Sequence, residues 1–337
     1  MKEIFKSLVI HSVVFVFMGA SSVLLANTPS ESPLPYVEHL PSYLAQNEKP
    51  SPSAPADSTP PSSTEPSRSV DKRSGSWTFQ WGYNRDAYTQ SDLNFRGPGY
   101  RFTMRDVVAK DKPEPLSSVY VNPNLFDIPQ FNWKVSRYFT DHIRISFGHD
   151  HMKYVMTPNQ QSSIYGYIDP LAIQKAHLQP ARDQLPLIYL FPNGLQRQAG
   201  FHTGEAFAIT PDFLKFEHTD GLNFLFADIG VTYPFWVSDD GESAISLDSS
   251  IGGGPVVCRS DIRVFGDGRN NRYNVCGYGV AAYVAVRLDI QKWLYIDLGA
   301  KAGYIDLPAI LTTGRSKDKA SQNFGFLEKL IYLGTTL

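Results

Sequence analysis

Hydrophobic and polar residues alternate at every second position along much of this chain. In the segment 143–148, Ile143, Ile145 and Phe147 fall on one side, and the residues between them are charged or small. The segment 131–136 alternates in the same way, and a short polar turn separates the two. A period of two with a polar turn predicts a β-hairpin.

The same alternation recurs from residue 76 to the last residue. It predicts ten strands, at 76–84, 90–96, 99–108, 130–139, 142–155, 213–235, 243–254, 276–289, 293–304 and 321–337. Within 213–235 the apolar side changes parity after Phe224, so that Ile229 and Val231 continue it. A β-bulge near Leu225-Phe226 would explain that change.

The connections between these strands differ in length on the two sides. If the first strand runs upward, the turns on one side are short, whereas those on the other side are mostly long: 109–129, 156–212, 255–275 and 305–320. Short turns on one side, long loops on the other and an even strand number are typical of outer-membrane barrels. We therefore predict an all-β fold, a transmembrane antiparallel β-barrel of about ten strands; eight or twelve would also fit.

A soluble β-sandwich also alternates, with its polar side in water. The polar positions here include many charges and glycines opposite uniformly aliphatic and aromatic positions, which favours a narrow polar lumen and a lipid-facing wall. The mean hydropathy is only −0.24, and aromatic residues make up 13% of the chain. A net charge of −2 gives no basic surface for nucleic acid. We expect no nucleic-acid partner and no cofactor.

The N-terminal region predicts export. Lys2 and Lys6 precede an apolar run from Leu8 to Leu25, followed by Ala26 as a cleavage residue, which is typical of a signal peptide. We predict three parts: a signal peptide at 1–26, a Pro/Ser-rich disordered spacer at 27–75, and a barrel at 76–337 with a long external loop, 156–212. The expected location is the outer membrane of a Gram-negative bacterium, with outer-membrane lipid and the barrel-assembly machinery as partners.

Two cysteines, Cys258 and Cys276, lie at the two feet of one predicted external loop. In an exported chain they favour a disulfide that staples the loop. Two unpaired thiols are the alternative.

Several segments resemble a family of outer-membrane β-barrel proteins of Gram-negative bacteria. The likeness lies in WGYNR (Trp81–Arg85), with DLNF and GYRFT after it, in DHMKYVM (Asp150–Met156) and in FLKFEHTDGLN (Phe213–Asn223). It covers most of 76–337. The resemblance implies location and fold, and no reaction. Such barrels commonly end in an aromatic residue, whereas this chain ends in Leu337.

One set of polar residues is predicted to gather at the external rim, because two neighbouring strands meet there. Its members are His149, Asp150, His151, Glu217, His218 and Asp220. Imidazoles with carboxylates could form a hydrolytic dyad or bind a metal. Omptin-type proteases and lipid A deacylases are similar only in using rim histidines, and no serine lies next to His218 in the sequence. Alternation places Asp150 toward the lumen, and we expect Asp150 and Glu217 to meet across the inner rim.

The simpler interpretation is that these are interface residues. A further set of charges is predicted to pair inside the lumen: Arg101, Arg105, Lys134, Arg144, Asp248, Arg287, Asp297, Lys301 and Glu328. We therefore expect a non-enzymatic barrel whose external loops carry a structural, surface-binding or adhesion role. The alternatives are a rim hydrolase and a narrow pore.

Overall fold

The computed structural model describes residues 69–115, 117–120, 122, 129–177, 198–266, 268, 272–313 and 316–337. Most of this part of the chain is β-strand. The predicted signal peptide and nearly all of the predicted spacer lie outside the described residues.

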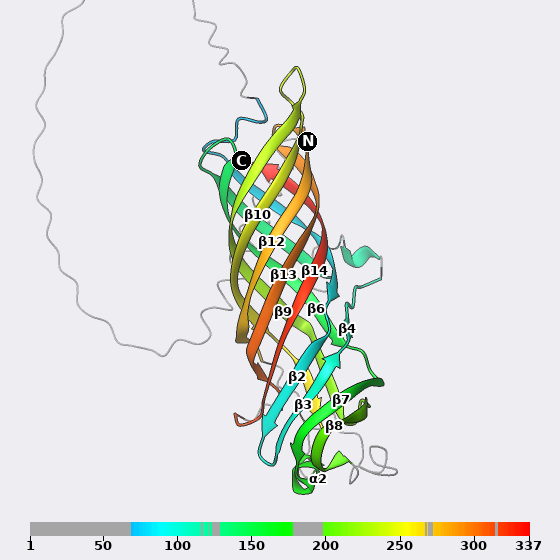
Figure 1. Ribbon diagram of the computed structural model, residues 1–337. Helices are drawn as coiled ribbons and strands as arrows, with labels where there is room; N and C mark the ends of the chain where they lie inside the picture. Colours follow the sequence, from blue (N-terminus) through cyan, green and yellow to red (C-terminus); the bar gives the residue numbers. More distant parts are fainter. Residues whose placement is uncertain are drawn as a thin grey trace, which may run out of the picture. The chain divides into compact units, whose positions relative to one another are not determined.

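Eight long strands form a closed antiparallel ring. They are β1 (Trp77–Tyr88), β5 (Phe131–Tyr138), β6 (Ile143–Met156), β9 (Leu214–Val237), β10 (Ala244–Cys258), β12 (Asn274–Gln291), β13 (Leu294–Leu311) and β14 (Lys319–Thr336), each bonded to the next in this order. The ring closes where β14 returns to β1, in register from Thr78↔Thr336 to Tyr88↔Phe326. Figure 1 shows the tilted wall. The predicted β-barrel is confirmed, with eight strands in its wall.

The difference from ten has a physical cause. The two predicted strands β2 (Ser91–Gly97) and β3 (Tyr100–Val107) exist, but they do not enter the wall. The whole length of β1 pairs with β14. The strand β2 therefore reaches β14 only at the N-terminal end of β14, over Ser321↔Asn94 to Lys319↔Arg96.

Beyond the ring, the same sheet continues outward through β2 and β3. Its order there is β2-β3-β7-β8, with β7 at Gln160–Ile168 and β8 at Gly200–Ile209. Both β7 and β8 come from the predicted long loop, as does the helix α2 (Pro170–His177). Two short strands extend ring strands, since β4 (Ala109–Lys110) pairs with β6 and β11 (Asp261–Val264) pairs with β9. A 3-10 turn, η2, spans Ser118–Tyr120. This part of the sheet lies at the end of the ring opposite the chain's C-terminus (Figure 1).

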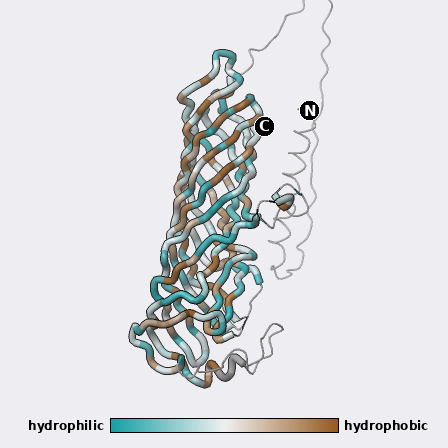
Figure 2. The backbone as a smooth tube through the Cα atoms, turned by 90° about the vertical axis from the view of Figure 1, so that its right-hand side faces the viewer, coloured by the Kyte–Doolittle hydropathy of each residue, from teal (hydrophilic) through white to brown (hydrophobic). Residues whose placement is uncertain are grey.

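The outer side of the wall carries an apolar band. Exposed aliphatic and aromatic side chains of several strands form it, among them Ile143, Ile145, Phe147, Ile229, Val231, Leu247, Val284, Val286, Leu298, Ile331 and Leu333. Exposed aromatic residues flank it, with Trp77, Phe139, Phe235 and Trp236 toward the C-terminal end of the ring and Tyr278 and Tyr304 toward the other. Figure 2 shows the alternating hydropathy along the strands. An outward apolar band between aromatic girdles is what a membrane-spanning barrel presents to lipid.

The inner side of the ring changes character along each strand, and β9 shows this most directly. Its buried side holds Phe216, Phe224 and Phe226 and then Asp228, while its outer side changes from Lys215 and Glu217 to Ile229 and Val231. The register against β6 runs without a shift through His149↔Leu225 and Phe147↔Ala227, so the predicted bulge near Leu225-Phe226 is wrong. The apolar side changes parity because the strand passes from a water-exposed part with an apolar core into an apolar band around a polar lumen.

The part of the molecule beyond the ring contains β2, β3, β7, β8 and α2 and is called the external part below. It has a hydrophobic core of its own. Phe95 on β2 stacks on Phe102 on β3, with ring centroids 5.0 Å apart, and Phe213, Phe216 and Phe265 pack around them. All five side chains are almost fully buried. Burying an aromatic side chain of this size contributes about 1.5–3 kcal/mol, so the external part is a packed unit rather than a set of loops.

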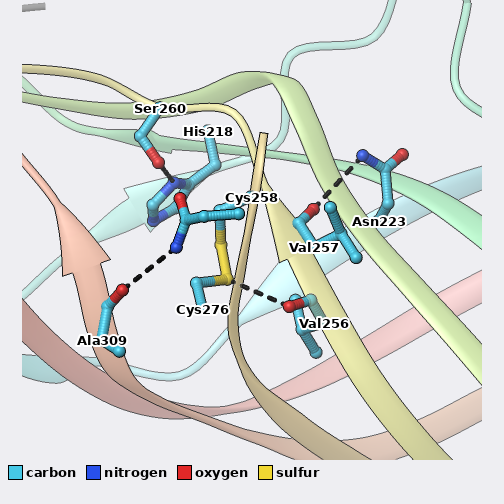
Figure 3. Close-up of a disulfide and its surroundings, with 9 residues drawn as sticks. His218, Asn223, Val256, Val257, Cys258, Ser260, Cys276 and Ala309 are labelled. Carbon is cyan, nitrogen blue, oxygen red and sulfur yellow. Dashed lines mark hydrogen bonds between the residues drawn. A yellow bond between two sulfur atoms is a disulfide. The ribbon is translucent and has the colours of Figure 1, made fainter. Parts of the chain in front are cut away.

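A disulfide joins Cys258 at the end of β10 to Cys276 near the start of β12. Both cysteines are buried in the external core, with Cα atoms 5.7 Å apart. The bond closes a loop that contains β11 (Figure 3).

Replacing both cysteines by serine is expected to loosen β11 without opening the ring. The β10–β12 ladder already restrains the two feet of the loop, so the expected cost is about 2 kcal/mol, at the low end of the usual range. Limited proteolysis should cut the double variant near β11 faster than the wild type. Its heat-modifiable migration in detergent gels should persist, and loss of that migration would show that the ring itself depends on the bond.

The end of the ring near the C-terminus is closed by the last residues before β1. Val70 and Arg73 are buried there. Arg73 donates from Nη2 to Asp289 Oδ2 at 2.8 Å and to Ser246 Oγ at 3.1 Å. None of the helices in the described part of the chain has both the length and the apolar character that a membrane crossing requires.

Candidate functional site at the external rim

The segment His149–His151 lies on β6 where the apolar band gives way to the external part. The three side chains do not point the same way. Asp150 is fully buried on the inner side of the ring, whereas His149 and His151 lie on the outer side with Ile145 and Phe147. Alternation along β6 therefore divides the triplet.

Asp150 belongs to a buried network in the lumen. Asn132 Nδ2 donates to Asp150 Oδ1 at 2.5 Å, and Lys301 Nζ forms an ion pair with Asp150 Oδ2. Lys301 also lies 3.7 Å from Glu328 Oε2, and Asn84 Nδ2 donates to Glu328 Oε1 at 2.7 Å. Every one of these groups is buried. A cation between two carboxylates is a structural ion cluster here, because Lys301 faces both acids and the amides of Asn132 and Asn84 donate to them.

The two histidines converge on one acceptor. Asn223, on β9, is the register partner of His151. Its Oδ1 lies 3.0 Å from His149 Nε2 and 2.8 Å from His151 Nδ1. Phe131 packs against both imidazoles, stacked on His151 with an interplanar angle of 21° and edge-on to His149 at 67°.

The three β9 candidates do not join Asp150. Phe224 is its register partner, whereas Glu217 pairs with Val155, further out along the strand. Glu217 points outward, 3.4 Å from Lys215 Nζ, and Asp220 lies on the surface 3.9 Å from Arg259 Nε. The expected meeting of Asp150 and Glu217 is wrong, because the outer side of β9 is the polar side at this height.

His218 instead faces the external core and meets a serine that the sequence did not indicate. Ser260 Oγ lies 2.7 Å from His218 Nδ1, next to the disulfide (Figure 3). The chain brings Ser260 there because β11 folds back along β9. His218 lies beyond the apolar band, and burial alone lowers its pKa to about 3. Its Nε2 is buried with no hydrogen-bond partner among the described residues. The pair thus lacks the orienting carboxylate of a triad.

Most of the predicted lumen charges are buried inside the ring, including Lys134, Arg144, Asp248, Arg287, Asp297, Lys301 and Glu328. Arg144 is the centre of one cluster, with Nη1 3.0 Å from Asp228 and Nη2 2.7 Å from Asp248. Arg287 Nε lies 2.8 Å from Asp289.

Arg101 and Arg105 were predicted to belong to that set, and this prediction is wrong. Both lie exposed on β3, outside the ring, and Arg105 pairs with Asp92. In the external part the apolar side of a strand faces the core and the charged side faces water, which is the reverse of the arrangement in the ring.

A cavity of about 10 Å³ lies among Phe226, Asp228, Gly252, Tyr283 and Lys301. That is room for about one water molecule.

No family model matches this chain, and none of the curated proteins matches it. The family implied by the sequence motifs is therefore not shown.

Similar solved structures are outer-membrane proteins. The chain is similar to OprG of Pseudomonas aeruginosa at 6% identity and a TM-score of 0.35, over 80% of this chain and 99% of that one. It is similar to AlkL at 8% identity and a TM-score of 0.32, over 85% and 96%. It is similar to Ail of Yersinia pestis, in complex with the heparin analogue sucrose octasulfate, at 8% identity and a TM-score of 0.24, over 78% of this chain and 99% of that one. At such TM-scores these likenesses carry no conclusion, and the fold rests on the strand ring itself.

Proposed function

We propose that this protein is a non-conducting, non-enzymatic barrel of the bacterial outer membrane that holds a folded β-sheet unit above the membrane for surface binding. The proposed route is export through the signal peptide at 1–26 and insertion by the barrel-assembly machinery. The closed ring and its apolar band support this location, because a spanning sheet needs every backbone group paired and an apolar outer face.

The filled lumen is the observation that carries the proposal. Three buried ion clusters follow one another along it, centred on Arg287, Arg144 and Lys301. Aromatic rings pack against cations of the lumen: Tyr295 lies against Arg287, with the guanidinium carbon 3.4 Å from the ring centroid, and the ring centroid of Tyr283 lies 4.3 Å from Lys134 Nζ. An eight-stranded ring is only wide enough for its own side chains. The arrangement supports a lumen filled by side chains and disfavours the narrow pore.

The external sheet supplies the surface for binding. Within the described residues, β8 pairs only with β7, so one edge of β8 is unpaired there. Phe201 on β8 is 84% exposed, and its ring centroid lies 4.7 Å from that of Tyr167 on β7. Exposed aromatic side chains are enriched in binding surfaces.

A rim hydrolase is the less favoured alternative. Asp150 forms an ion pair with Lys301 inside the ring, and His218 and Ser260 are buried in the external core. A catalytic group must come within hydrogen-bond reach of its substrate, and these groups are enclosed by packed side chains.

The purified protein in planar bilayers is expected to show no ion conductance at any applied voltage. The reason is that hydrated ions cannot pass three buried ion clusters without unfolding them. A porin added to the same bilayer at the end of the recording confirms that the membrane accepts channels. Stepwise currents that scale with the amount of this protein would contradict the proposal.

Location and binding need separate measurements. Cell fractionation should place the protein with outer membranes, and recovery in the soluble periplasmic fraction would end the proposal. Cells that display the wild type should adhere to hydrophobic polystyrene beads more strongly than cells displaying Phe201→Ser with Tyr167→Ser. Equal adherence at equal surface amounts would remove this sheet from the binding role.

A further inference from the structure

The outer-rim cluster of His149, His151 and Asn223 has no part in the proposed binding surface or in the lumen. Its two imidazoles come from alternate residues of β6, so both project from the same side of the strand. The amide comes from the adjacent strand and meets both rings. Three donor atoms from two strands thus converge on one point of the wall.

The two distances from the amide oxygen to the ring nitrogens are hydrogen-bond lengths, and they also fit neighbouring ligands of one metal ion. Two ligand atoms each about 2.0–2.1 Å from a metal are about 2.9 Å apart at a right angle and about 3.3 Å apart at the tetrahedral angle. The amide oxygen lies 3.0 Å from His149 Nε2 and 2.8 Å from His151 Nδ1. The separations therefore fit right-angled positions, which Cu²⁺ and Ni²⁺ favour with nitrogen and oxygen ligands.

Neighbouring groups hold the donors in place. Asn223 Nδ2 donates to the carbonyl oxygen of Val257 at 3.3 Å, which directs Oδ1 toward the imidazoles (Figure 3 shows the Asn223–Val257 bond). Gly221 leaves the room that this amide needs, since a Cβ there would lie 2.5 Å from Asn223 Nδ2. Phe131 packs on both rings. Groups that orient the ligands strengthen metal binding.

The charges nearby permit a cation. Lys153 is the cationic residue that follows His151 on the outer side of β6, and its Nζ lies 3.0 Å from Glu114 Oε1. The charge of Lys153 is thus compensated. His151 is 93% buried, because its exposed fraction is 7%, and partial exclusion of water strengthens electrostatic interactions at the site.

We propose that His149, His151 and Asn223 bind a single divalent transition-metal ion of the class that prefers imidazole, with Cu²⁺ as the favoured ion. The ligands are His149 Nε2, His151 Nδ1 and Asn223 Oδ1. Without metal, the two imidazoles donate N–H protons to the amide oxygen. With metal, each imidazole is neutral and carries its proton on its other ring nitrogen, so that the ligating nitrogen offers a lone pair. No group of three His, Cys, Asp or Glu side chains among the described residues could hold a metal; the third donor here is an amide.

The probe is Cu²⁺ added to the full mature chain, folded in detergent and without a polyhistidine tag. Calorimetry should give one site per chain, and electron paramagnetic resonance should show hyperfine coupling to two imidazole nitrogens. His149→Gln and His151→Gln should each weaken binding at least tenfold, and the double variant should lose the two-nitrogen signal. The matched control is His142→Gln, since His142 lies just before β6 with its Nδ1 3.1 Å from the Thr232 carbonyl oxygen. It should leave binding unchanged.

Asn223→Asp separates a ligand from a merely structural amide. A carboxylate in the same place adds negative charge to the donor set, so Cu²⁺ affinity should rise several-fold. Heat-modifiable migration identifies which variants are folded. The proposal is overturned if the folded double histidine variant binds Cu²⁺ like the wild type, or if the wild type binds none.

Discussion

Replacement of Arg144 by methionine is expected to lower the free energy of unfolding of the barrel by about 3–5 kcal/mol. The guanidinium is buried, and its two nitrogens satisfy Asp228 and Asp248. Methionine fills similar space but leaves two carboxylates enclosed without their cation. Denaturant unfolding of the protein folded in detergent or lipid vesicles, followed by gel mobility, measures the change.

Two further variants test the reason for that loss. Arg144→Met combined with Asp228→Asn and Asp248→Asn removes the uncompensated charges and should recover most of the stability. Arg105→Met breaks an exposed pair with Asp92 on the external sheet and should cost about 1 kcal/mol or less. If Arg144→Met costs no more than Arg105→Met, the lumen is hydrated and the cluster does not close it.

A lysine in place of Ile229 is expected to destabilise the barrel in lipid by about 2–4 kcal/mol. Ile229 is 61% exposed on the outer side of β9, midway along the apolar band between Leu225 and Phe235. An ammonium group there has no water and no counter-ion. The unfolding free energy in phospholipid vesicles gives the size of the effect.

Thr219→Lys is the matched control, on the same strand and the same outer side but within the external part. It should change the unfolding free energy by less than about 1 kcal/mol, because the new charge meets water. Equal penalties for the two variants would show that the band does not lie in lipid.

The wall could be predicted from sequence because one rule governs it. In the segment from Ile143 to Phe147, outward residues are apolar and inward residues are small or charged, and the structure places each accordingly. The number of wall strands could not be predicted in this way. Phe95 and Phe102 alternate as regularly as wall residues do, yet they face a buried core outside the ring.

Other elements were missed because their local signal is weak or absent. The strand β7 contains glutamine, serine and glycine, and its pairing with β3 and β8 supplies what its composition lacks. At the rim, counting along β6 correctly separates Asp150 from its neighbouring histidines. The contacts of Asn223 and Ser260 depend on the register of β6 against β9 and on the return of β11, which no short-range pattern encodes.

The reversal of side-chain polarity along β9 also sets the depth of the ring in the bilayer and the height of the external part above it. On the outer side of the strand, the boundary between Asn223 and Leu225 fixes how deep the ring can sit, since movement either way would put polar residues into lipid or apolar ones into water. Above that boundary β9 continues from Phe224 back to Leu214. At about 3.3 Å per residue and a tilt of about 40°, that segment rises roughly 25–30 Å. The external part therefore rises from the headgroup level to nearly one hydrocarbon thickness above the bilayer, so that its outermost strands lie beyond the lipid headgroups and open to large molecules approaching from the side.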